Sequence, residues 1–69
     1  MIKISIPMNQ EFVKETLLET GLFTFVEKQG INLFFNSTIE DQADAIKQAK
    51  AAIKAKPEGS VLYFQVTGV

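Results

Sequence analysis

The sequence predicts an α+β fold in a single domain that covers residues 1–69. Three observations lead to this class. Apolar and polar residues alternate near the beginning, in the middle and at the end of the chain, which is typical of strands. Between these segments, apolar residues recur at helical spacing. Glycine, proline and N-capping residue types fall at the boundaries, so the segments are expected to be separate elements.

The first two elements are a strand and a helix. Isoleucine alternates with polar residues over Ile2–Ile6, and Pro7 ends this predicted strand. Asn9 is a typical N-cap residue, and Gly21 supplies the residue type that ends helices. The spacing between them predicts a helix that ends at Thr20.

The next segment, residues 22–36, predicts a β-hairpin, because both arms are rich in β-branched and aromatic residues. A three-residue loop, Lys28–Gly30, requires a positive φ only at its glycine. A two-residue loop, Gln29–Gly30, also requires one at the glutamine, which is unfavourable. The longer loop is therefore favoured, and it points Phe23 and Phe25 into the core. The shorter loop would turn both to the opposite face, since a one-residue slip exchanges the faces of a strand.

A second helix and a last strand complete the chain. Ser37 and Glu40 form a capping-box pattern, which predicts that this helix begins directly after Ser37. Its predicted core face consists of Ile39, Ala43, Ile46, Ala49 and Ile53. Pro57 is expected to end the helix, and residues 60–66 are expected to form the last strand.

The resulting order β-α-β-β-α-β is that of the ferredoxin-like, or split βαβ, arrangement. It places two helices on one face of a four-stranded antiparallel sheet, because crossover connections are right-handed. The first and third strands are expected at the centre, and the second and fourth at the edges. The other face of the sheet has no covering element within this chain.

Composition limits the chemistry of the protein. The chain contains no cysteine, no histidine and no arginine, and its net charge is −1. Disulfides and thiolate or imidazole metal sites are therefore excluded, as are the most common general base and the guanidinium that binds phosphate. No cofactor or metal is predicted, and the chain is expected not to be an enzyme. The charge argues against a dedicated nucleic-acid binder.

Nothing in the sequence indicates a signal peptide or a membrane-spanning segment. A cytoplasmic protein without membrane association is therefore expected. A chain of this length buries only about 60% of its unfolded surface, so association with a second copy is an expected means of stabilisation.

The uncovered face of the predicted sheet is the candidate interaction face. Phe34 lies on it in either hairpin register, because its neighbour Phe35 points into the core. The predicted apolar members of this face are Leu22, Val26, Phe34, Val61 and Tyr63, and its polar neighbours include Lys3, Asn32 and Asn36. So many apolar residues on one face indicate a contact surface, although single exposed apolar residues are ordinary.

The predicted last strand, residues 60–66, has no charge and no proline and is expected at a sheet edge. Natural edge strands usually carry a charge, a proline or a bulge, which prevents pairing with other chains. This strand has neither a charge nor a proline. The favoured function is therefore a small interaction domain that self-associates as a homodimer through the uncovered face, the last strand, or both. The alternatives are a ligand-sensing module that binds a small molecule between subunits, and single-stranded nucleic-acid binding on the sheet face.

Overall fold

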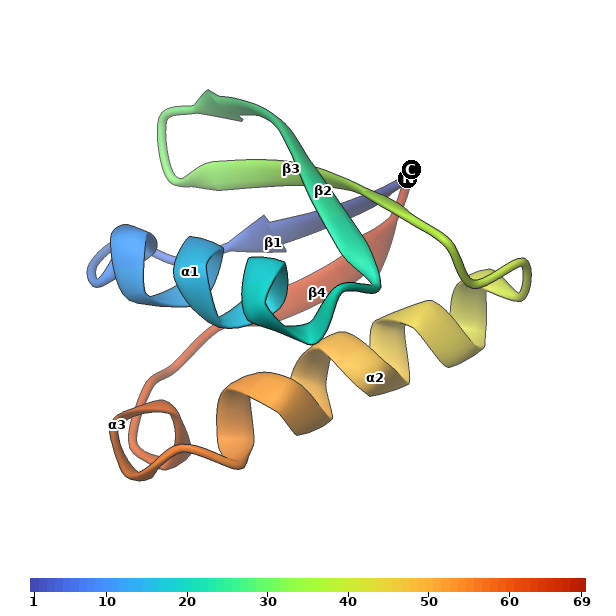
Figure 1. Cartoon of the computed structure of the whole chain (residues 1–69). Helices are drawn as coiled ribbons and strands as arrows, with labels where there is room; N and C mark the ends of the chain where they lie inside the picture. Colours follow the sequence, from blue (N-terminus) through green and yellow to red (C-terminus); the bar gives the residue numbers. More distant parts are fainter.

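The chain folds into a four-stranded antiparallel sheet with helices packed on one side, in a computed structural model that describes residues 1–69 (Figure 1). The strands are β1 (Ile2–Ser5), β2 (Phe23–Gln29), β3 (Asn32–Ser37) and β4 (Gln65–Gly68). The helices are α1 (Gln10–Thr20), α2 (Gln42–Lys54) and the single turn α3 (Pro57–Ser60). The predicted α+β class is confirmed. The prediction of only two helices is wrong, because the predicted turn at Pro57 forms α3.

The strand order is β2-β3-β1-β4, and every neighbouring pair is antiparallel. β1 and β3 are therefore central and β2 and β4 are edges, as expected from the element order. Helices α1 and α2 lie on the same side of the sheet, and the two chain ends lie close together (Figure 1). No helix has the length and apolar character required to cross a membrane.

The core lies between this side of the sheet and the helices. Every second residue of a strand points to the helices. Alternation therefore buries Ile2 and Ile4 of β1 and Leu33 and Phe35 of β3. The twelve buried residues of the core are Ile2, Ile4, Ile6, Val13, Leu17, Phe23, Leu33, Phe35, Ala45, Ala49, Ile53 and Val66. Phe25 packs edge-to-face on Phe35 with ring centroids 5.6 Å apart, at the border of this core.

The hairpin differs from both predicted loops. Its two-residue loop is Gly30–Ile31, with a positive φ of 60° at the glycine only, which matches the glycine position of a type II′ turn. This loop alone would turn Phe25 away from the helices. A β-bulge between Phe25 and Glu27 shifts the register by one residue, so Phe23 and Phe25 return to the core side. Their predicted orientation is confirmed, but the predicted loop is wrong.

Two further boundaries differ from the predictions. Helix α2 begins after Asp41, whose side chain accepts a hydrogen bond from the N–H of Ala43 at 3.0 Å. Ser37 instead pairs with Phe23 as the last residue of β3, so it is not the helix cap. On α2, Ala49 and Ile53 are buried as predicted, but Ala45 is buried in place of the predicted Ala43, which is exposed in the first turn.

Strand β4 begins later than predicted. Its pairing with β1 starts at Gln65, opposite Ser5. Continuing this register would place Tyr63 opposite Pro7, which has no N–H to donate. The hydrogen-bonded part of the last strand therefore moves toward the end of the chain, and Val61–Phe64 lie outside it.

Candidate interaction surface

The uncovered side of the sheet is mostly polar. One cross-strand row contains Glu27, Phe34, Lys3 and Thr67, in the order β2-β3-β1-β4. The next row contains Gln29, Asn32, Ser5 and Gln65. The Ser5 hydroxyl donates to Asn32 Oδ1 at 2.6 Å, which ties two of these side chains to each other. Phe34 is the only aromatic residue in the two rows.

The structure brings together only part of the predicted interaction face. Phe34, Lys3, Asn32 and Asn36 lie on the uncovered side, and Phe34 is half-buried there. Leu22 precedes β2 and packs against the core, so its predicted place on this face is wrong. Val26 is 41% exposed and lies in the bulge of β2. Val61 and Tyr63 lie before β4, so the predicted continuous apolar patch does not form on the sheet.

The segment Val61–Phe64 nevertheless keeps the alternation of a strand. Leu62 and Phe64 pack against the core, whereas Val61 and Tyr63 are each 82% exposed. The same alternation continues into β4, where Val66 is buried and its neighbours Gln65 and Thr67 are exposed. An exposed aromatic side chain therefore projects from the chain immediately before the edge strand.

The outer edge of β4 has unpaired backbone groups. The N–H of Val69 donates to the carbonyl of Met1 at 3.1 Å, beside β1. Because bonded and non-bonded pairs alternate in an antiparallel ladder, Thr67 and Gln65 also bond to β1. The N–H and C=O groups of Val66 and Gly68 then point away from β1. No turn, loop or side-chain hydrogen bond uses these groups. The four residues of β4 carry no charge.

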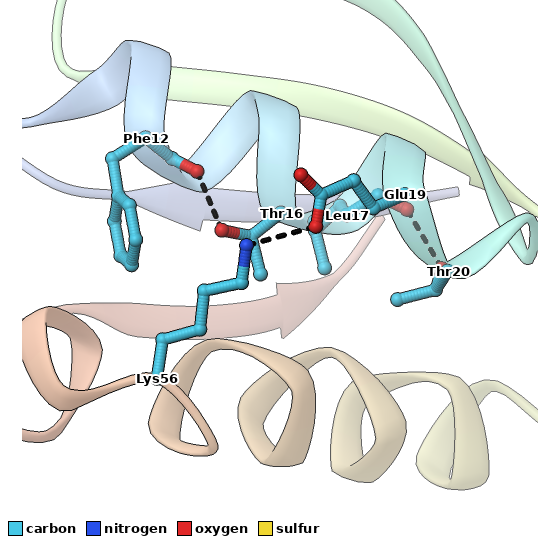
Figure 2. Close-up of polar contacts among 6 residues, drawn as sticks. All are labelled: Phe12, Thr16, Leu17, Glu19, Thr20 and Lys56. Atoms are coloured by element: carbon cyan, nitrogen blue, oxygen red, sulfur yellow. Dashed lines mark hydrogen bonds and ion pairs between the residues drawn. The ribbon is translucent and has the colours of Figure 1, made fainter.

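A lysine anchors the chain that leads to this edge. Lys56, directly before α3, donates to Glu19 Oε2 of α1 at 2.8 Å, and its ammonium lies 5.9 Å from the ring centroid of Phe12 (Figure 2). In the same view, the buried hydroxyl of Thr16 donates to the carbonyl of Phe12, which satisfies it within the helix. No sequence pattern identified the Lys56 contact, because its partner lies on a distant element. It is the only salt bridge of the chain.

A shallow hollow of about 240 Å³ lies where the chain ends meet α2. Its wall includes Ile2, Ser37, Ile39 and Glu40. Gln42 also lines it and donates to the carbonyls of Met1 and Val69, at 2.7 and 3.3 Å. Glu40 is its only charged side chain, which leaves no cluster of groups aimed at a ligand. No group of three or more carboxylates is placed to hold a metal ion.

Comparisons with other proteins gave no match to a family model, to a curated protein or to a solved structure. The surface chemistry described above therefore carries the functional argument.

Proposed function

We propose that this chain is a small, non-enzymatic interaction module that self-associates through the open edge of β4. The scaffold we propose is the ferredoxin-like arrangement. The strand order β2-β3-β1-β4, with antiparallel neighbours, supports that assignment. The observation that carries the function is the row of unpaired backbone groups at Val66 and Gly68, on a strand with no charged residue.

A second copy is the partner that this edge fits best. An antiparallel edge is complementary to itself, since the N–H and C=O of one residue face the C=O and N–H of its counterpart. Such pairing gives a closed twofold interface rather than an open chain of copies. No like charges meet in it, because Gln65, Thr67 and Gly68 are uncharged. The interface is small, so we expect a dimer with an affinity on the order of micromolar.

The uncovered sheet face supports self-association less well. Its single aromatic, Phe34, is half-buried and lies between Glu27 and Lys3 in the cross-strand row. An interface over this face would remove these charges from water, which is costly unless they find partners. Pairing at β4 removes no charged side chain of that strand from water, because its four residues are uncharged.

Matched threonine variants test the proposal. Thr67 on β4 and Thr24 on β2 are both exposed on edge strands and on the uncovered side. Thr67→Glu should weaken association about tenfold or more, because two carboxylates then approach one interface. Thr24→Glu should leave association unchanged. Sedimentation velocity from micromolar to millimolar concentration measures both, and a wild-type chain that stays monomeric throughout contradicts the proposal.

A second candidate, single-stranded nucleic-acid binding, is favoured by one observation. Phe34 lies on a central strand of the uncovered face, directly opposite Lys3 of β1. A base stacked on Phe34 would have a lysine beside its phosphate. Glu27, on the other side of Phe34, opposes this. Amide shifts during titration with an oligothymidine at low salt test it, and shifts must centre on Phe34 if this function exists.

A further inference from the structure

The self-association proposed above admits several registers between the two β4 strands. Only residues whose backbone groups point outward form the bonded pairs, and in β4 these are Val66 and Gly68. The same alternation adds Phe64 at the preceding outward position. A register that pairs at least two of these three residues has its twofold axis at Gln65, Val66 or Thr67.

The chain before Tyr63 is not available for pairing. Val61 has φ −106° and ψ −2°, which is not extended backbone. The N–H of Leu62 already donates to the carbonyl of Gly59 at 3.2 Å. Pairing is therefore limited to residues from Tyr63 onward. The register with its axis at Gln65 then loses its Leu62–Gly68 pairs and keeps only its two Phe64–Val66 pairs, about four hydrogen bonds.

We propose that two copies pair with the twofold axis at Val66, which rests on the proposed self-association. Val66 then lies opposite Val66, Phe64 opposite Gly68, and Gln65 opposite Thr67 of the second copy. This register uses every outward-facing group from Phe64 to Gly68 and gives about six inter-strand hydrogen bonds. Among the groups from Phe64 to Gly68, an axis at Thr67 pairs only Val66 with Gly68, which gives about four hydrogen bonds.

The same register brings exposed apolar side chains together. Tyr63 of one copy lies opposite Val69 of the other, and the twofold axis repeats this contact. Tyr63 is 82% and Val69 57% exposed, and both continue the alternation of the uncovered side. Aromatic and β-branched residues directly opposite each other stabilise antiparallel pairs. In this register the exposed side chain of Tyr63 is covered by the second copy and anchors the interface.

Single cysteines distinguish the registers, because the natural chain contains none. Gln65 and Thr67 are exposed, so cysteine is tolerated at both. Opposite residues of a non-bonded antiparallel pair have Cα atoms about 4.5 Å apart, within the range for a disulfide. A mixture of the Gln65→Cys and Thr67→Cys chains, oxidised with oxidised glutathione, should form the mixed disulfide about tenfold faster than either homodimer. Intact-mass spectrometry separates the three products.

Each outcome decides between the alternatives. A dominant Thr67→Cys homodimer places the axis at Thr67, and a dominant Gln65→Cys homodimer places it at Gln65. Either result overturns the register but keeps self-association. A Thr24→Cys chain on β2 gives the background of random collisions. If no product exceeds this background while the wild-type chain sediments as a dimer, pairing through β4 is wrong. A monomeric wild-type chain overturns the proposed function itself.

Discussion

The two edges of the sheet are built differently. β2 has seven residues, contains a bulge after Phe25 and carries Glu27 and Lys28. β4 has four residues, no charge and no bulge, and an exposed Tyr63 lies just before it. Bulges and charges obstruct pairing with another chain, whereas an uncharged regular edge permits it. The contrast indicates that β2 is protected against pairing with another chain and that β4 lacks this protection.

This difference depends on how each edge is supported. β2 follows α1 and is paired with β3 at both of its ends, on either side of the bulge at Val26. β4 is approached through α3, and the contact between Lys56 and Glu19 attaches that approach to α1 (Figure 2). Substitutions near β2 and near β4 should therefore differ in their effects on the free energy of unfolding and on association.

The largest effect is expected at Gly59 of α3. A Cβ atom there would overlap the carbonyl oxygen of Ile53, so Gly59→Ala must displace backbone. We expect a loss of about 3 kcal/mol in the free energy of unfolding. Gly30→Ala, in the hairpin of β2, has open space but a positive φ, and should cost about 1–2 kcal/mol. Urea denaturation followed by circular dichroism measures both, and equal costs would contradict the overlap at Gly59.

Removing the protection of β2 should give it the property proposed for β4. Deletion of Val26 combined with Glu27→Thr and Lys28→Thr removes the bulge and both charges. A chain with two open edges should form assemblies larger than a dimer, because each copy then pairs at both sides. Light scattering measures this. A variant that remains no larger than the wild type would show that the bulge and charges are not what separates the two edges.

A smaller effect on association distinguishes an interface at β4 from one on the uncovered face. Tyr63→Ser should weaken association about tenfold, close to 1.4 kcal/mol, because each dimer loses two aromatic contacts. Phe34→Ser should change association by less than about twofold, since Phe34 lies away from β4. Sedimentation equilibrium gives both constants. The reverse order of effects would move the interface to the uncovered face.

The smallest effect is expected at the anchor of the α3 segment. Lys56→Met keeps the packing over Phe12 and removes the ion pair with Glu19. Both side chains are partly exposed, so we expect a loss of about 0.5 kcal/mol in the free energy of unfolding. Repeating the urea denaturation in molar salt supplies the control, because screening should abolish most of the difference between wild type and variant.

Local patterns determined most of the fold. Helix α1 follows Asn9 as predicted, but Asn9 has a positive φ of 60° and its side chain makes no capping hydrogen bond. Alternation placed Ile2, Ile4, Leu33 and Phe35 in the core, and Gly21 ended α1. These features depend on neighbours within a few residues, so the sequence expresses them directly. The alternating exposure from Val61 to Thr67 was predictable for the same reason.

Pairing between distant segments decided the rest. The Gly30–Ile31 loop alone would point Phe23 and Phe25 away from the core, and the bulge at Val26 turns them back into it. Ser37 belongs to β3 because Phe23 lies opposite it. The start of β4 at Gln65 depends on where its partner β1 ends, at Ser5, two residues before Pro7. These choices also dispersed the predicted apolar patch, while the predicted place of the last strand at a sheet edge is confirmed. A strand's own residues specify its two faces, but only its partner specifies its register and ends, because the ladder hydrogen bonds belong to both strands.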